Sequence, residues 1–177
     1  MSRIQIKNVR LSFPSLFEKS VFEGKEGKYE ATFLLPKEDT KTKKILDNAI
    51  NELLTEAKIK VKEDMICLKD GDEIFEEKEY EGYEGHWALK ASNKKRPLVI
   101  DRDRTPLDSS DEKPYAGCYV NAIIEFWAQN NAYGKRINAN LFAVQFLKDG
   151  KKFGNDGPVD VKISEEFEDL GDLDDDI

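Results

Sequence analysis

The segment from residue 117 to residue 147 alternates between apolar and polar side chains for most of its length. A period of two residues is typical of a β-strand with one buried face. The apolar positions are Cys118, Val120, Ala122, Ile124 and Phe126, then Ile137, Ala139, Leu141 and Ala143. Between the two runs lie residues 130–134 (NNAYG), where Asn and Gly can supply the positive φ of a hairpin turn. The sequence therefore predicts a long hairpin of two strands, 117–128 and 135–147, with one face in a core.

The rest of the chain predicts shorter strands and one helix. The expected strands are residues 4–13 with a bulge near Asn8, 29–35, 86–91, 98–100 and a last one at 159–163. Asp39 or Thr40 can cap a helix whose apolar residues recur at helical spacing from Ile45 to Ala57. Residues 62–84 and 101–116 carry no clear period and are expected to be irregular. We therefore predict a mainly β protein with one packed helix, barrel-like and without alternating βαβ units.

The charge of the chain is unevenly distributed. Its net charge is −8, from 36 acidic and 28 basic residues, but residues 164–177 contain eight acids and no base. The remaining residues, 1–163, are thus balanced at 28 acids and 28 bases. A segment so acidic and poor in apolar residues cannot form a core. We expect a folded domain at 1–163 and a disordered acidic tail at 164–177.

The sequence gives little support for a metal site, a phosphate-binding loop or a catalytic centre. Two cysteines and one histidine are too few for a zinc site of Cys and His, and no GxxxxGK[ST] phosphate loop is present. We therefore expect no metal, no cofactor and no catalytic residue. With no apolar run of 18 residues and no apolar stretch at the N-terminus, the protein is expected to have no membrane partner and to be cytoplasmic.

The second face of the predicted hairpin combines aromatic rings, amides and cations. If the two strands pair, it presents Tyr119, Trp127 and Phe142 beside Asn121, Asn138, Asn140 and Arg136, with Tyr133 and Lys135 at the tip. Bases stack on aromatic rings, and cations follow the phosphates of a single strand. This face is therefore a candidate site for single-stranded nucleic acid. For Trp127 and Phe142, a second layer of core beneath the helix is an equally good interpretation.

A second basic cluster surrounds the predicted strands at 86–91 and 98–100. It consists of Lys90, Lys94, Lys95, Arg96, Arg102 and Arg104, and Trp87 precedes it. Cations at strand ends and in loops can line a groove for a phosphate backbone. Arg102 and Arg104 alternate with Asp101 and Asp103, however, so local ion pairs are an alternative for these two.

Several stretches resemble a family of single-stranded DNA-binding proteins of phages and prophages. They are residues 9–17, 29–37 and 87–97, and above all YAGCYVNA (115–122), GKRI (134–137) and AVQF (143–146). The resemblance covers about residues 4–155. It implies an OB fold with five barrel strands plus additional strands, and a groove that binds single strands without marked sequence preference in replication or recombination. It also implies that the acidic tail modulates binding or recruits phage or host proteins. Self-association on DNA is left open.

The predicted function is thus binding of single-stranded DNA without catalysis, although ring stacking would serve RNA equally well. One alternative is a protein–protein adaptor that acts through its acidic tail. Another is a Mg²⁺-dependent nuclease that uses Asp101, Asp103, Asp108 and Asp111.

Overall fold

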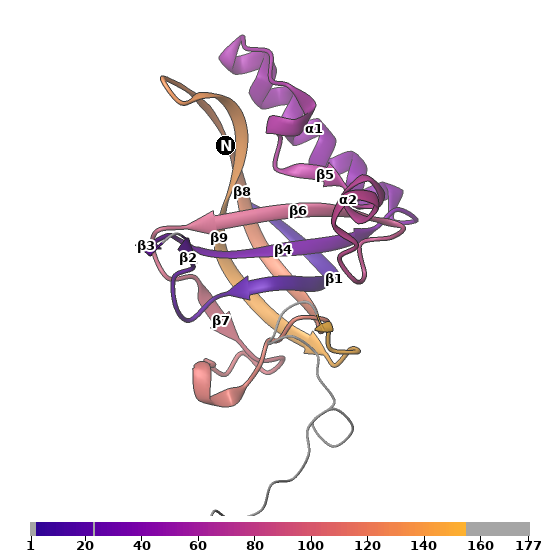
Figure 1. The fold of residues 1–177 in the computed structure, drawn as a ribbon, viewed down its shortest axis with the longest axis vertical. Helices are drawn as coiled ribbons and strands as arrows, with labels where there is room; N and C mark the ends of the chain where they lie inside the picture. Colours follow the sequence, from indigo (N-terminus) through magenta and orange to yellow (C-terminus); the bar gives the residue numbers. More distant parts are fainter. Residues whose placement is uncertain (1–2, 23, 155–177) are drawn as a thin grey trace, which may run out of the picture.

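The computed structural model describes residues 3–22 and 24–154 (Figure 1). The strands and helices follow in this order: β1 (Ile4–Ser15), β2 (Val21–Phe22), β3 (Lys25–Glu26), β4 (Tyr29–Pro36), α1 (Thr40–Ala57), η1 (Glu63–Met65), β5 (Leu68–Asp70), α2 (Gly71–Lys78), β6 (His86–Asn93), β7 (Leu98–Ile100), η2 (Ser109–Asp111), β8 (Tyr119–Asn131) and β9 (Gly134–Lys148). Both η1 and η2 are single 3₁₀ turns. The expected strand at 159–163 and the acidic tail at 164–177 lie outside the described residues.

Five strands pair in a closed ring. β4 and β8 both pair antiparallel with β1, β6 pairs antiparallel with β4, and β9 pairs antiparallel with β8. A parallel contact between β6 and β9, with Ser92 opposite Asn140, completes the ring. β7 extends the sheet beside β9, and β5 extends it beside β6. The prediction of a mainly β, barrel-like domain with additional strands is confirmed.

The bulge expected near Asn8 is present and explains the change of phase in β1. The pairing register with β8 shifts between Ile6 and Val9, and Asn8 has a positive φ of 54°. Because one extra residue is inserted, the buried positions change from even to odd, so Ile6, Val9 and Leu11 all lie in the core.

A second bulge corrects the expected faces of β9. The register with β8 shifts between Ile123 and Ile124, which are opposite Ala143 and Leu141, and this leaves Phe142 as the inserted residue. Ile137, Ala139 and Leu141 are buried as predicted, but beyond the bulge the buried residues are Val144 and Phe146. The placement of Ala143 on the core face was therefore wrong.

The hairpin turn is tighter than expected. Asn131 is opposite Gly134, so only Ala132 and Tyr133 connect the strands. The positive φ, 117°, belongs to Gly134. Asn131 contributes instead through its side chain, whose Oδ1 accepts a hydrogen bond of 2.9 Å from the backbone N–H of Tyr133.

The helix α1 begins where the sequence places it. The carboxylate of Asp39 accepts a hydrogen bond of 3.1 Å from the N–H of Thr42, which is the expected cap. Leu46, Ile50 and Leu53 are buried in the core enclosed by the ring strands, whereas Ile45 is 52% exposed. In Figure 1 the helix lies beside the β8–β9 hairpin. Neither α1 nor any other helix among the described residues has both the length and the apolar character needed to cross a membrane.

The prediction that residues 62–84 are irregular was wrong. This stretch contains β5 and α2, and the N–H of Cys67 donates to the carbonyl of Ile137 at 3.0 Å while its carbonyl accepts from Lys90 at 3.1 Å. Residues 66–70 thus fill the space between β6 and β9 where these strands no longer pair with each other. The strand has three residues, too few to show a period in the sequence.

A smaller apolar cluster covers part of the outer face of β4 and β6. It consists of Leu34, Tyr83, Ala88, Ala116 and Phe153, flanked by the half-buried Phe13, Ile74, Phe75 and Tyr80. The residues after α2 carry the tyrosines, and Phe153 arrives from the segment after β9. The rest of this outer face remains open and forms the site described next.

Candidate nucleic-acid interface

A groove of about 1190 Å³ runs over the open part of the outer face of β4 and β6; we call it the sheet groove. Thr32, Lys90 and Ser92 line it from the two strands. Its other lining comes from the end of β1, the segment from η1 through α2 to Tyr83, and residues 136–139 at the start of β9. The strands that form it are close together because β6 pairs with both β4 and β9.

Both acids and bases line the sheet groove, six acids against four cations. Its cations are Lys69, Lys78, Lys90 and Arg136, and its acids are Glu30, Glu63, Asp64, Asp70, Glu73 and Glu77. Lys90 forms an ion pair of 3.0 Å with Glu30, so part of its charge is compensated. Arg136 carries no ion pair to the residues that the structure describes. The same holds for Lys69 and Lys78, so these three cations of the groove are the ones available to an added anion.

Three aromatic rings gather at one part of the sheet groove, those of Phe13, Tyr80 and Tyr83, and none of them was predicted from the sequence as a binding residue. The centroids of Phe13 and Tyr80 are 4.8 Å apart, and those of Tyr80 and Tyr83 are 5.4 Å apart, both in edge-to-face arrangements. The hydroxyls of Tyr83 and Ser12 are hydrogen-bonded at 2.9 Å. The sequence carries one signal for this cluster, an aromatic residue directly before Pro14, but Phe13 was interpreted only as the end of a strand.

The hairpin residues predicted to bind DNA fall into two groups. Arg136 lines the sheet groove, and Trp127 is half-buried opposite Asn138, which also lines it. Tyr133, at the tip, is 88% exposed, and Lys135 follows it on the surface. Trp127 and Lys135 are thus neighbours of groove residues, across the hairpin from Asn138 and next to Arg136, while Tyr133 lies farther out in the turn.

Tyr119 and Phe142 lie elsewhere, and cations of the protein cover their rings. The guanidinium carbon of Arg3 lies 4.1 Å from the ring centroid of Phe142. The ring of Tyr119 has Lys148 at 4.9 Å and Arg10 at 5.7 Å. Neither residue lines the sheet groove.

Trp87 also lies away from the groove, packed against the main core. Lys37 and Lys43 approach its ring at 4.7 and 4.2 Å. Lys37 in turn binds the carboxylates of Asp70 at 2.7 Å and Asp72 at 2.6 Å. The hydrogen bonds to these acids raise the pKa of Lys37, and those from Lys37 lower the pKa of both aspartates.

The other predicted cations are exposed in two loops. Lys94, Lys95 and Arg96 follow β6, which carries the groove residue Ser92, and the guanidinium of Arg96 lies 5.4 Å from the ring of Phe17. Arg102 and Arg104 lie in the loop after β7. The acids beside them have other partners: Asp101 pairs with Lys113 at 2.9 Å, and Asp103 accepts from the N–H of Thr105 at 3.0 Å.

The aspartates of this loop hold its turns. Asp108 accepts from the N–H of Ser110 at 2.9 Å, and Asp111 accepts from the N–H of Asp108 at 2.8 Å. The hydrogen bond from Lys113 lowers the pKa of Asp101, and bonds from Ser110 lower that of Asp108. Within residues 3–22 and 24–154, no three acids, histidines or cysteines are grouped as a metal site requires.

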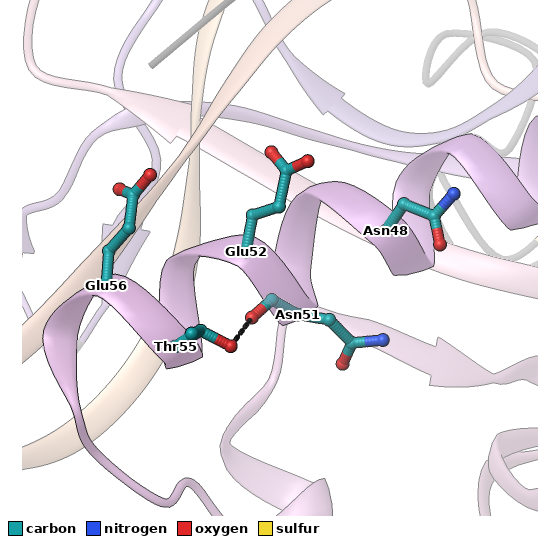
Figure 2. A pocket seen from close by; sticks show the side chains of 5 residues that line it. All are labelled: Asn48, Asn51, Glu52, Thr55 and Glu56. Atoms are coloured by element: carbon teal, nitrogen blue, oxygen red, sulfur yellow. Dashed lines mark hydrogen bonds between the residues drawn. The ribbon is translucent and has the colours of Figure 1, made fainter.

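A second hollow, of about 450 Å³, lies on the outer side of α1 (Figure 2). Asn48, Asn51, Glu52, Thr55 and Glu56 line it. The hydroxyl of Thr55 donates to the backbone carbonyl of Asn51 at 2.9 Å, which is a bond within the helix. Two carboxylates and no cation make this hollow unsuited to a polyanion.

The strand order and the groove together define the class of protein. Five strands closed by a parallel contact, with a groove on the outer face of the second and third ring strands, are the features of an OB-like binding domain of the kind that holds oligonucleotides. The family model described as "Enterobacter phage Enc34, ssDNA-binding protein" matches residues 2–177. The chain belongs to this family, which is one of binding proteins and not of enzymes, and the resemblance seen in the sequence is confirmed.

Individual relatives agree with this assignment. Protein p50 of Acyrthosiphon pisum secondary endosymbiont phage 1 is 42% identical over 180 residues, which span 95% of this chain and 94% of that protein. The single-stranded DNA-binding protein from bacteriophage Enc34, solved in complex with ssDNA, is 39% identical with a TM-score of 0.79 over 86% of this chain and 89% of that one. The protein gp2.5 of bacteriophage T7, also a single-stranded DNA-binding protein, has a TM-score of 0.57 over 96% of this chain and 98% of its own. At 11% identity, that last likeness shows a shared fold alone.

Proposed function

We propose that this protein binds single-stranded DNA in the sheet groove, without catalysis and largely without regard to sequence. The observation that carries the proposal is the groove itself, in which four cations and the half-buried rings of Phe13 and Tyr80 lie over the outer face of β4 and β6. Its volume of about 1190 Å³ is also larger than the roughly 300–1,000 Å³ of small-molecule pockets. Family membership supports the choice of DNA as ligand.

Phosphate contacts are proposed for the cations in the groove and at its ends. These are Lys90 and Arg136 in the groove, Lys135 on the hairpin, and Lys94, Lys95 and Arg96 after β6. Trp127 and Tyr133 are proposed as additional stacking rings beside them. Arg102 and Arg104 would extend the path of the strand past β7. Trp87, Tyr119 and Phe142 are proposed to support the fold instead, because protein cations already cover their rings.

The test is fluorescence anisotropy of a labelled oligo-dT over a salt series. Each lost phosphate contact should reduce the slope of log K against log salt by about 0.7 for a single strand. We expect the double variant Lys135→Ala, Arg136→Ala to reduce the slope by about 1.4. Lys44→Ala, an exposed lysine on α1, is the matched control and should leave the slope unchanged. An unchanged slope in the double variant would remove the hairpin from the site.

A wild-type protein that does not bind oligo-dT at low salt would refute the function as a whole. The adaptor function, carried by the eight acids of residues 164–177, would then be the one to pursue. The same titration with oligo-U tests whether DNA is preferred over RNA.

We also propose that residues 1–163 form the binding domain and that the acidic tail competes with DNA for its cations or recruits partner proteins. Eight acids and no base make the tail resemble a polyanion. A chain that ends at Ile163 should bind oligo-dT more tightly than the full chain, and most clearly at low salt, where screening is weak. Equal affinity at low salt would contradict competition. The proposed setting is phage DNA replication and recombination in the host cytoplasm.

A further inference from the structure

We infer that Phe13 and Tyr80 form a site on which a base of the bound strand stacks, a role that rests on the proposed function of the sheet groove. Both residues line the groove and both are half-buried, so part of each ring is accessible from it. The rings predicted from the sequence for this role are those of the hairpin and Trp87, and neither Phe13 nor Tyr80 is among them.

The backbone of Phe13 turns its ring out of the β1–β4 ladder. The pairing register of β1 with β4 shifts between Ser12 and Ser15, and Phe13 lies inside this bulge with a positive φ of 46°. Bulky residues rarely adopt this left-handed conformation, and strained positions of this kind gather at functional sites. The bulge points the side chain of Phe13 at Tyr80 rather than into the main core.

The ring of Tyr80 is held in place from both sides. It makes edge-to-face contacts with Phe13 at 4.8 Å and with Tyr83 at 5.4 Å. Tyr83 is 3% exposed and hydrogen-bonded to Ser12, so it anchors the row of rings to β1. A ring fixed in advance loses little conformational entropy when a base stacks on it.

The loop that carries Tyr80 is fixed as well. Gly82 lies directly against the ring of Phe153, and the N–H of Gly85 donates to the carboxylate of Asp72 at 2.9 Å. Cations and hydroxyl groups of the same groove, among them Lys90 and Thr32, complete the combination of stacking and phosphate contacts that single strands require.

The first experiment compares an oligo-dT with a strand of equal length that lacks all bases. Because one stacked base is lost, Tyr80→Leu should bind oligo-dT about 5- to 150-fold more weakly than the wild type at fixed salt, with the salt slope unchanged. The affinity for the abasic strand should stay the same, since that strand has nothing to stack. Tyr80→Phe, which keeps the ring, should bind like the wild type, and Phe13→Leu should behave like Tyr80→Leu.

The matched control is Tyr119→Leu, which removes a ring outside the groove and should leave oligo-dT binding unchanged. If the wild type binds but both leucine variants also bind oligo-dT normally, the stacking site is refuted while the proposed function stands. An equal loss for oligo-dT and the abasic strand would also refute it, because the defect would then be structural. A wild type that does not bind at all refutes both.

A second measurement uses the wild-type protein and so does not depend on the stability of a variant. A strand that contains 5-iodo-deoxyuridine is irradiated in the complex, and the cross-linked residue is located by mass spectrometry. Cross-links at Tyr80 or Phe13 support the inference. Cross-links confined to other rings, such as Trp127 or Tyr133, overturn it.

Discussion

Gly82 and Phe153 meet so closely that a hydrogen atom is the only side chain that fits between them. A Cβ at position 82 would overlap the end of the Phe153 ring, and Gly82 also has a positive φ of 89°. The guanidinium carbon of Arg10 lies over the ring of Phe153, 4.3 Å from its centroid. This contact joins the segment after β9 to the loop that carries Tyr80.

We expect Gly82→Ala to lower the free energy of unfolding by about 2–4 kcal/mol, since overlap is added to a conformation that alanine disfavours. Gly85→Ala is the matched control: its φ is also positive, at 70°, but nothing lies within 4 Å of its would-be Cβ. That variant should lose only about 1 kcal/mol. Urea denaturation measures both, and equal losses would show that the Phe153 contact is unimportant.

The two cysteines are free thiols whose environment makes them unreactive. Burial raises the pKa of Cys67 to about 12 and that of Cys118 to about 11. Because only the thiolate reacts with disulfide reagents, both thiols should react slowly at pH 8 in the folded protein. Cys118, which is fully buried, should show negligible modification, and Cys67, which is partly exposed, should be modified slowly. Ellman's reagent should reveal both thiols in full once urea unfolds the chain. Rapid reaction of the folded protein would contradict the burial of these side chains.

Among the elements, those with a strong period were predictable and those without one were not. The hairpin was found because Val120, Ile124 and Phe126 alternate with polar residues, and the bulge at Asn8 was found because it reverses such an alternation. β5, with three residues, and α2, with eight, were missed because elements this short in an acidic stretch show neither the two-residue period of a strand nor the roughly 3.6-residue period of a helix. Tertiary pairing with β6, which a single sequence does not reveal, stabilises them.

The same limit explains what could be foreseen of the site. Lys90 and Arg136 lie on predicted strands, so their presence near a groove followed from the charge pattern. Phe13 and Tyr80 are 67 positions apart and meet only through the bulge of β1 and the loop after α2. Trp87 was an attractive candidate by composition, but odd positions of β6 face the core beneath α1.

Lys37 connects the end of β4 with the junction of β5 and α2 through its ion pairs to Asp70 and Asp72. Because the pKa of Asp70 is lowered in the folded protein, its contribution to stability is present above the ordinary value of 3.8 and disappears as the pH falls through the lowered pKa. We expect Lys37→Met to melt at a lower temperature than the wild type at pH 7. The difference should shrink below about pH 4.

Lys41→Met, at an exposed lysine of α1, is the control and should show no such pH dependence. The measurement is thermal unfolding followed by circular dichroism at pH 7, 4 and 3. A difference that stays constant down to pH 3 would mean that packing against Trp87, and not the ion pair, is what Lys37 supplies.

At the scale of the whole molecule, the larger of the two apolar clusters, to which the five ring strands and α1 contribute, is the main core of the protein. We expect Leu141→Ala, at a fully buried position of β9, to cost about 2–5 kcal/mol of unfolding free energy. Leu98→Ala removes the same atoms from β7, where the residue is 56% exposed, and should cost less than about 0.5 kcal/mol. Chemical denaturation distinguishes the two, and similar losses would show that the side chain of Leu98 contributes to the core as Leu141 does.

The closed ring of five strands also determines when each strand of a newly synthesised chain can pair with its neighbours. Ile4 of β1 is opposite Ile124 of β8, so β1 lacks one of its two neighbours until 120 further residues have been made. At roughly 5–20 residues per second, this interval lasts about 6–24 seconds. Throughout it, β1 can pair with β4 but presents its other edge unpaired, the kind of edge through which nascent chains aggregate. A pause in translation before codon 124 would therefore harm the yield of folded protein more than a pause after β9.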